Sequence, residues 1–244
     1  MRLRVLNSGS KANGYLLYND SEALVIECGC PYSSCLEALG FDRKKIVGAF
    51  VTHEHGDHAK FVDQYLNAGI KVYASQGTID SLAVKSAYKP RAVANKQCIT
   101  VGGFVVCAFS TKHDSAEPMG FLVVHKDLGT LLFATDTYYL EYKFAGLTAV
   151  MIECNYDLGI LDENVNNGVI KKFVRDRVLK SHMSLETTIS TLKANDLTRV
   201  NKVVLLHLSN HNSNPEMFRD KVEQEVGKVV YVAEKGLDIN LNEL

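Results

Sequence analysis

Four side chains of metal-binding type stand close together at His53, His55, Asp57 and His58. They follow an apolar stretch over residues 46–51, which we interpret as a strand that delivers them to one end of a sheet. In extended backbone the first two histidines project to the same side. A glycine then lets the chain turn and aim the second pair at a neighbouring point. Imidazole and carboxylate ligands suit Zn²⁺, Mn²⁺ or Fe, so this spacing predicts two adjacent divalent metal ions.

Three further candidate ligands, His113, Asp136 and His207, each come directly or shortly after another apolar run. A buried strand would deliver its next polar side chain to the edge of a sheet, and a shared placement of this kind favours a common site. Each of these three residues taken alone would more often be an ordinary loop residue. The sets expected to converge are His53, His55 and His113 on one metal ion, and Asp57, His58 and His207 on the other, with Asp136 bridging the two.

The elements that must position these residues are short and numerous. Apolar stretches bounded by Gly, Asn, Asp or Lys predict strands at residues 2–6, 14–18, 22–27, 46–51, 70–74, 97–101, 103–109, 119–125, 130–135, 147–153, 201–206 and 228–233. Periodic stretches predict helices near residues 32–39, 60–68, 76–87, 164–180, 184–195 and 215–226. Ser184 is a weak candidate cap, and Asn214 before Pro215 is a better one. This order predicts an α+β fold, with mixed sheets covered by helices.

The composition is that of an ordinary soluble globular protein. Of the 244 residues, 46% are apolar and 23% are charged, and no repeat or linker divides the chain, so we expect one domain over residues 1–244. The formal net charge of −1 gives no overall attraction to nucleic acid, although a local basic patch could supply it.

The cysteines and the N-terminus predict a cytoplasmic location. Arg2 and Arg4 interrupt any N-terminal signal region, and no apolar run is long enough to span a membrane. The cysteines form no zinc-ribbon pattern, so we expect them to be reduced and mostly small core residues; they are Cys28, Cys30, Cys35, Cys98, Cys107 and Cys154.

The order of the candidate ligands resembles that of the metallo-β-lactamase superfamily. Longer motifs are similar to its YycJ-like (WalJ-type) group of exonucleases, over about residues 3 to 215. The motifs are Ser8-Gly9-Ser10-Lys11-Ala12-Asn13, the stretch from His113 to Phe121, Ala134-Thr135-Asp136-Thr137, Glu153-Cys154-Asn155, Ser181-His182-Met183-Ser184 and His207-Leu208-Ser209. The metal motif points only to the superfamily, whereas the longer set points to the group. Tyr156 and Ser181 depart from the group, which usually has His and Gly there.

The resemblance implies a metallo-β-lactamase fold, a four-layer αββα sandwich with the metal site at one edge of the two sheets. It also implies that His182 is not a ligand but a general acid near the scissile phosphate, since His is well suited to proton transfer near neutral pH. The basic residues before His182, at 171–180, would then attract phosphate, although a solvated helix face is an equal alternative. Substrate contacts are expected at Ser8, Ser10, Asn13, Ser209 and Asn212.

The function that these expectations imply is a dinuclear-metal-dependent phosphodiesterase, a nuclease of 5′-to-3′ exonuclease type acting on DNA or RNA. A hydroxide shared by the two metal ions would attack phosphorus. Asp57 would be both a ligand and an acceptor of the water's proton, and His182 would protonate the leaving oxygen. The alternatives are a thioesterase or lactonase of glyoxalase II type and a non-catalytic metal-binding protein. Nucleic acid is the expected partner, with no membrane and no obligate protein partner.

Overall fold

The computed structural model describes residues 1–242, so the last two residues of the predicted domain lie outside the described part. That residues 1–244 form one domain stays a prediction. A first sheet of seven strands has the order β14-β1-β2-β3-β4-β5-β6. Its strands are β1 (Arg2–Asn7), β2 (Gly14–Tyr18), β3 (Ala23–Ile26), β4 (Ile46–Phe50), β5 (Val72–Ala74), β6 (Arg91–Ala92) and β14 (Asp238–Asn240). The pairs from β3 to β6 are parallel, so the carboxyl ends of these strands meet at one edge.

A second sheet of seven strands has the order β13-β12-β11-β10-β9-β8-β7. Its strands are β7 (Cys98–Val101), β8 (Phe104–Ser110), β9 (Met119–His125), β10 (Gly129–Ala134), β11 (Ala149–Glu153), β12 (Lys202–Leu206) and β13 (Val229–Val232). The pairs from β7 to β10 are antiparallel, and those from β10 to β13 are parallel. Both sheets are therefore mixed, as the sequence predicts.

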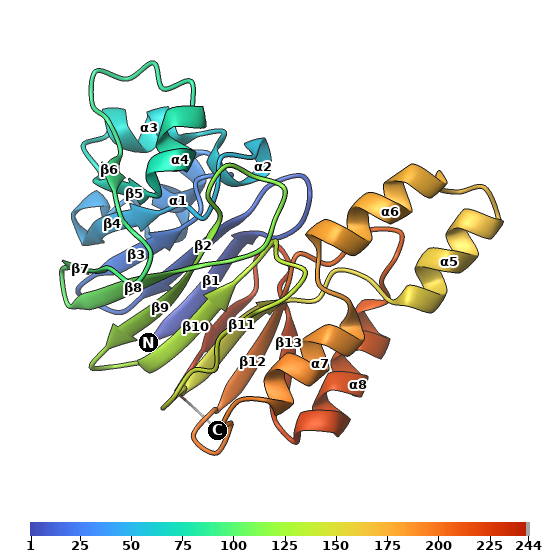
Figure 1. Ribbon diagram of the computed structural model, residues 1–244. Coiled ribbons are helices and arrows are strands. Elements are labelled where there is room, and N and C mark those ends of the chain that lie inside the picture. The colour runs from blue at the N-terminus through green and yellow to red at the C-terminus, as the bar shows by residue number, and fades with distance from the viewer. Residues whose placement is uncertain (243–244) are drawn as a thin grey trace.

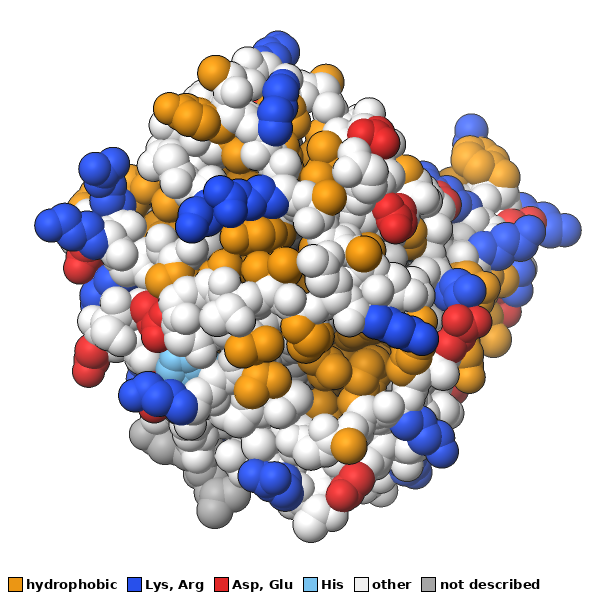
Figure 2. Space-filling model, turned by 60° about the vertical axis from the view of Figure 1, so that its left-hand side comes forward, with side chains coloured by type: hydrophobic (Ala, Val, Ile, Leu, Met, Phe, Trp, Pro, Cys, Tyr) orange, Lys and Arg blue, Asp and Glu red, His pale blue; other side chains and the backbone are white. Residues whose placement is uncertain are grey.

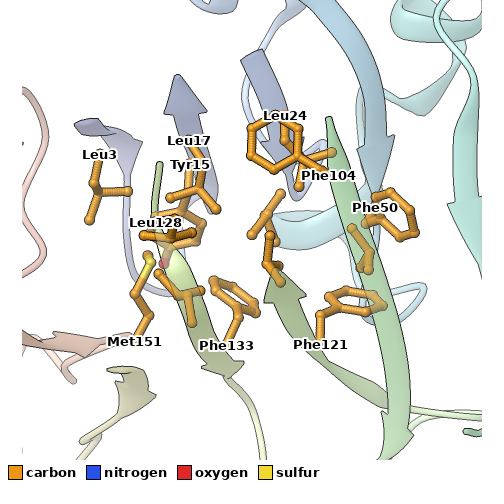
Figure 3. Packing of buried hydrophobic residues seen from close by; sticks show 14 of the residues in the cluster. Leu3, Tyr15, Leu17, Leu24, Phe50, Phe104, Phe121, Leu128, Phe133 and Met151 are labelled. Carbon is orange, nitrogen blue, oxygen red and sulfur yellow. The ribbon is translucent and has the colours of Figure 1, made fainter. Parts of the chain in front are cut away.

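Each sheet is apolar on both faces, because its central strands are covered on both sides. In β10, Leu131 and Phe133 point into the core between the two sheets, while Leu132 and Ala134 point to the outer face. This alternation follows from the two-residue period of a strand. Aromatic pairs in edge-to-face geometry join the sheets across the core, with ring centroids 5.4 Å apart for Tyr15 and Phe133 (Figure 3).

Helices cover the two outer faces (Figure 1). On the first sheet, residues of α1 (Tyr32–Ala38) and α3 (Val62–Asn67) join a cluster with the outer side chains of the strands. On the second sheet, α7 (Leu185–Lys193) and α8 (Pro215–Val226) do the same. The order helix, sheet, sheet, helix confirms the predicted four-layer αββα sandwich. The remaining helices are α2 (Gly56–Ala59), α4 (Gln76–Ser81), α5 (Leu158–Asn166), α6 (Lys172–Ser181) and a 3₁₀ turn at Arg43–Lys45.

Two helix predictions were wrong in extent. The helix expected over 76–87 ends at Ser81, since the amides of Lys85 and Ser86 donate to the Asp63 carboxylate instead of continuing the helix. The helix expected over 164–180 is two helices, α5 and α6, because the chain turns at Gly168, whose φ is 70°.

The predicted caps of the last two helices are confirmed. The Ser184 hydroxyl accepts from the amide of Thr187 at 3.1 Å at the start of α7. The Asn214 side chain accepts from the amide of Met217 at 3.1 Å, with Pro215 as the first residue of α8.

The cysteines differ from the expectation at one place. Cys98 and Cys107 lie directly opposite each other on β7 and β8 and form a disulfide, so the prediction that all six are reduced is wrong for this pair. Because disulfides are typical of oxidising surroundings, the cytoplasmic location stays a prediction. The other four cysteines are buried. Burial raises the pKa of Cys30 to about 11, which favours the neutral thiol over the thiolate. No helix within residues 1–242 is both long and apolar enough to cross a membrane.

Candidate metal centre

The seven predicted ligands gather at one edge of the sandwich, in the loops that follow strand ends. His53 to His58 follow β4, His113 follows β8, Asp136 follows β10 and His207 follows β12 directly. Their candidate ligand atoms form two groups, each with all atoms within 4.8 Å of one another: His53, His55 and His113 in the first, and Asp57, His58, Asp136 and His207 in the second.

Two histidines of the first group, His53 and His113, are held in a tautomer that leaves a ring nitrogen available to a metal ion. The Nδ1 of His113 lies 2.8 Å from the carbonyl oxygen of Ser181 and can only donate to it. The Nδ1 of His53 lies 2.9 Å from the hydroxyl of Thr52, which itself donates to a carboxylate. Each Nδ1 therefore carries the proton, and the Nε2 lone pair of each ring points into the site.

Glu27 is the carboxylate behind this group, and the sequence reasoning missed it. It is fully buried, directly follows β3, and accepts from the Thr52 hydroxyl at 2.6 Å. Its Oε1 also lies 3.2 Å from Nδ1 of His58, a member of the second group. Glu27 thus orients His53 of the first group through Thr52 and contacts His58 of the second group directly. A carboxylate hydrogen-bonded behind a metal ligand commonly has this orienting role.

Asp136 lies between the two groups. Its Oδ2 is 3.5 Å from Nε2 of His113 and 3.4 Å from Nε2 of His58, and its Oδ1 is 3.2 Å from Nδ1 of His207. Burial would raise its pKa, but the surrounding imidazoles, that of His207 foremost, hold the pKa well below its usual range. A carboxylate that reaches both groups suits the predicted bridging position.

The residues present fit divalent metal ions. Nε2 of His53 in the first group and Nε2 of His207 in the second are fully buried, yet neither has a hydrogen-bond partner within residues 1–242. Buried polar atoms are rarely left unpaired, so an atom aimed at an acidic cluster without a partner indicates a missing ligand. The donor set of imidazoles and carboxylates is the one that Zn²⁺ and Mn²⁺ accept.

Asn13 has a different role from the predicted one. Its side chain is fully buried, so direct contact with a substrate is ruled out. Its amide group donates to Oδ2 of Asp57 at 3.2 Å, and its backbone amide donates to the Asp57 carbonyl at 2.7 Å. Gly29 also approaches here so closely that a Cβ would lie 1.7 Å from the same carbonyl oxygen. Asn13 therefore holds Asp57 in place, and the glycine makes that close approach possible.

The other predicted substrate contacts lie in different places. Ser10 lines the same hollow as the metal ligands. The Ser8 hydroxyl accepts from the amide of His207 at 3.0 Å, so it supports a candidate ligand. Ser209 accepts from the amide of Asn212, and Asn212 is buried with its Oδ1 bound to the amide group of Asn164. These two residues are not among those that line the hollow, so the structure favours Ser10 as the contact of this set.

His182 lies directly after α6 and faces a buried carboxylate that sequence reasoning also missed. Its Nδ1 donates to Oε1 of Glu153 at 2.7 Å, and the backbone amide of Thr137 donates to Oε2 of the same carboxylate at 2.7 Å. Burial opposes the charged imidazole, but the Glu153 carboxylate raises the pKa of His182 above its usual value. With Nδ1 engaged in this way, Nε2 is the nitrogen that can face a substrate.

The position of His182 allows a second interpretation. Its candidate ligand atom also lies within 4.8 Å of those of Asp136, Glu153 and His207. A metal ligand and a proton donor are therefore both geometrically possible at this position, and mutation must separate them.

The ligands surround a hollow of about 240 Å³, and one wall comes from α6. The wall residues are Val174, Arg177, Val178, Ser181 and His182. Since the carbonyl of Ser181 rather than its side chain binds His113, a Ser in place of the group's usual Gly leaves that contact intact.

The basic stretch is less free than the sequence suggests. The Nε of Arg175 lies 2.5 Å from Oδ1 of Asp162 on α5, and the Nε of Arg177 lies 3.0 Å from Oδ2 of Asp114. Lys171 and Lys172 have no carboxylate partner within residues 1–242. The cations available to a substrate are therefore mainly the lysines, with the unpaired Nη groups of Arg177.

The fold and the site together define a class of protein. The profile of the Metallo-beta-lactamase superfamily matches residues 8–139. The chain belongs to this superfamily, and its clustered His and Asp side chains form a candidate site for divalent metal.

One protein of similar sequence and two proteins of similar structure can be named. The chain is 27% identical over 239 residues to exodeoxyribonuclease YycJ of Bacillus anthracis, which covers 92% of this chain and 88% of the relative. The metallo-beta-lactamase fold protein YhfI of Bacillus subtilis has a similar structure, with a TM-score of 0.72, 16% identity and 98% of each chain covered. The short form of human tRNase Z gives a TM-score of 0.62, 18% identity and 99% of each chain covered. The expected family and fold are confirmed.

Proposed function

We propose that this protein is a dinuclear-metal phosphodiesterase that acts as a nuclease, with exonuclease activity on DNA or RNA. The observation that carries the proposal is a hollow where Asp136 of the second group also reaches His113 of the first, beside the hydrogen-bonded pair of Glu153 and His182. The similarity to an exodeoxyribonuclease supports the same class of substrate. We expect two metal ions, and this expectation rests on the geometry and the donor chemistry of the two groups of ligands.

Two divalent metal ions would supply Lewis-acid polarisation of the phosphoryl group and an acidified water. His53, His55 and His113 would hold one ion, and Asp57, His58 and His207 the other, with Asp136 between them. Zn²⁺ and Mn²⁺ are the favoured ions, and Fe is an alternative.

The protein's own residues orient the ligands and protonate the leaving oxygen. Asn13 and Ser8 fix the backbone and side chains of the second group, and Asp57 is placed to accept a proton from the attacking water. His182 donates its Nε2 proton to the leaving oxygen, while Glu153 stabilises the charged imidazole through Nδ1. An alkoxide is a poor leaving group without a proton, so this pair matches a phosphodiester substrate.

A thioesterase of glyoxalase II type is the main rival on this fold. A thiolate leaves readily without a proton, so such an enzyme has less use for a buried carboxylate that keeps a histidine charged. The Glu153–His182 pair therefore favours the phosphodiesterase over both the thioesterase and a non-catalytic metal-binding protein.

The test uses the full chain stripped of metal and reloaded with Zn²⁺ or Mn²⁺. We expect hydrolysis of end-labelled DNA or RNA and of bis(p-nitrophenyl) phosphate, with labelled ends released first, and little turnover of a glutathione thioester or a lactone. Efficient thioester hydrolysis by a protein that leaves every nucleic acid intact would contradict the proposal.

A further inference from the structure

Helices α5 and α6 form a hairpin that projects from the sandwich (Figure 1), and α6 lines the hollow of the candidate metal site. The ion pair of Arg175 with Asp162 ties the two helices together. The amide group of Asn164 on α5 donates to the carbonyl of His211 at 2.8 Å, which fixes the hairpin to the loop after β12. These contacts therefore hold the hairpin in a defined position relative to the hollow.

The surface of this hairpin combines exposed apolar side chains with positive charge. Phe173 is 68% exposed and Val169 is 58% exposed. Residues 158–181 contain five basic and three acidic side chains, although the whole chain has a net charge of −1. The projecting part at the right of Figure 2 accordingly shows Lys and Arg side chains next to hydrophobic ones. On the rest of that face the cations are scattered.

One side of α6 leads from this surface into the hollow. Phe173, Arg177 and Ser181 recur every four residues, so they lie along the same side of the helix. Arg177 and Ser181 line the hollow, and His182 follows at its wall. With a rise of 1.5 Å per residue, Phe173 lies about 14 Å from His182, roughly four nucleotides at the spacing of stacked bases.

The hollow is too small to hold a polymer. Its volume of about 240 Å³ is below the roughly 300–1,000 Å³ of sites that enclose drug-sized ligands. It can take the group around one scissile bond, and the neighbouring nucleotides must lie on the surface outside. The side of α6 that leads outward from the hollow is the charged and aromatic surface available for them.

We propose that the α5–α6 hairpin binds the single-stranded part of a nucleic-acid substrate, with a base stacked on Phe173. Lys171, Lys172 and the Nη groups of Arg177 would contact the phosphates on either side. Base pairs inside a duplex have no free face for an aromatic ring, whereas the bases of a single strand do, so an exposed Phe173 favours a single strand over the body of a duplex. This inference rests on the proposed function and names the form of its substrate.

The same surface fits a protein partner less well. The cores of protein interfaces are depleted in lysine, whereas here two lysines directly precede the exposed phenylalanine. Neither lysine has a carboxylate partner among the described residues that would neutralise it. Interleaved aromatic and cationic side chains are the pattern of a surface that binds single-stranded nucleic acid.

The experiment measures binding by the metal-loaded full chain to a labelled phosphorothioate oligothymidylate of about 15 nucleotides, which resists cleavage. Phe173→Ala should raise Kd roughly 5- to 150-fold, the range for loss of one base stack. Phe173→Leu should lose as much, because it keeps an apolar side chain without an aromatic face, and Phe173→Tyr should restore binding. Tyr88→Ala removes an aromatic ring that is 64% exposed in the loop between α4 and β6, so it serves as the matched control with unchanged Kd.

The outcomes separate this inference from the proposed function. If all Phe173 variants bind like the wild type while the wild type still cleaves unmodified DNA or RNA, the hairpin inference alone is wrong. If Phe173→Leu binds as the wild type does, apolar docking replaces stacking and the inference is also wrong. A change in oligomeric state without a change in Kd would make the hairpin a contact between copies of the chain. A wild type that neither binds nor cleaves nucleic acid would overturn the proposed function itself.

Discussion

Replacing His182 with alanine should slow the cleavage of a natural phosphodiester far more than that of an activated one. The imidazole lies at the wall of the hollow, with Nδ1 bound to Glu153 at 2.7 Å. If His182 donates the proton to the leaving oxygen, its loss should lower kcat on DNA or RNA by about 10²- to 10⁴-fold, the usual contribution of a positioned acid. Both metal ions and the fold should be retained.

The buried carboxylate of Glu153 determines how much rate we expect Glu153→Gln to lose. Glu153 is fully buried, and its hydrogen bond to a charged imidazole is of the kind that contributes about 1.5–3 kcal/mol. Glu153→Gln keeps the shape but removes the charge, so the protonated form of His182 should become roughly 10- to 150-fold less favourable. The nuclease rate should fall by a similar factor, and the double variant should be little worse than His182→Ala, because the two residues act as one unit.

The assay compares two leaving groups at matched metal loading. p-Nitrophenolate is stable as an anion near neutral pH and leaves without a proton. Hydrolysis of bis(p-nitrophenyl) phosphate should therefore be much less sensitive to His182→Ala than cleavage of an end-labelled oligonucleotide. Metal content is measured in parallel on every variant, so that a lost ion is not mistaken for lost acid catalysis.

Two results would refute the reasoning. Equal losses on both substrates would mean that His182 positions the phosphate and does not donate a proton. Loss of a metal ion from His182→Ala would mean that the group of His182 with Asp136, Glu153 and His207 is a ligand set, and that the general acid lies elsewhere.

The remaining predictions concern the metal ions and the basic surface. Elemental analysis should find close to two metal ions per reconstituted chain and about one in His207→Ala, and a wild type with at most one would contradict the dinuclear site. Glu27→Gln should weaken metal affinity about 10- to 100-fold in chelator competition, because the carboxylate orients ligands of both groups; an unchanged affinity would make its role purely structural. Replacing Lys171 and Lys172 together by alanine should reduce the salt slope of single-strand binding by about 1.4. Arg175→Ala should change it less, since Asp162 already neutralises that guanidinium, and equal effects would show that the ion pair opens on binding.

The gathering of the candidate ligands at one edge could be predicted because one physical rule applies to their placement. A buried strand is apolar, and the first polar side chains after it are delivered to the edge of the sheet. The rule places His113 after β8, Asp136 after β10 and His207 after β12, as the structure shows. It also applies to Glu27 and Glu153, which complete apolar runs, but neither residue belonged to the expected ligand set. A carboxylate at the end of a buried strand must be paired, and that signal was available in the sequence.

Other features depend on contacts that no local pattern reports. The carbonyl of Ser181 fixes the tautomer of His113 across 68 residues of chain, and any residue type supplies a carbonyl. Asn13 was assigned to the substrate because of its motif, whereas its burial against Asp57 becomes visible only once the loops are packed. The break between α5 and α6 depends on a glycine in left-handed backbone, which the helical period does not exclude.

Strained backbone marks three strand ends of the site. Glu27, Asp136 and His207 have φ values of 69°, 46° and 54°, in the left-handed region that non-glycine residues rarely occupy. Conformations of this kind cost of order 1–3 kcal/mol each and persist only where the surroundings hold them. The apolar sandwich behind the site must therefore offset that cost.

Tyr15 shows how the core holds the second group of ligands. Its ring packs on Phe133 in the core between the sheets, with centroids 5.4 Å apart. The Tyr15 hydroxyl donates to the side chain of Asn13 at 3.2 Å and lies 2.8 Å from the Ser8 hydroxyl. The Ser8 hydroxyl in turn accepts from the amide of His207. Since Asn13 in turn donates to Asp57, one core residue reaches the supports of two candidate ligands on different sheets. The spacing of this part of the candidate metal centre is therefore fixed by the packing of the sandwich.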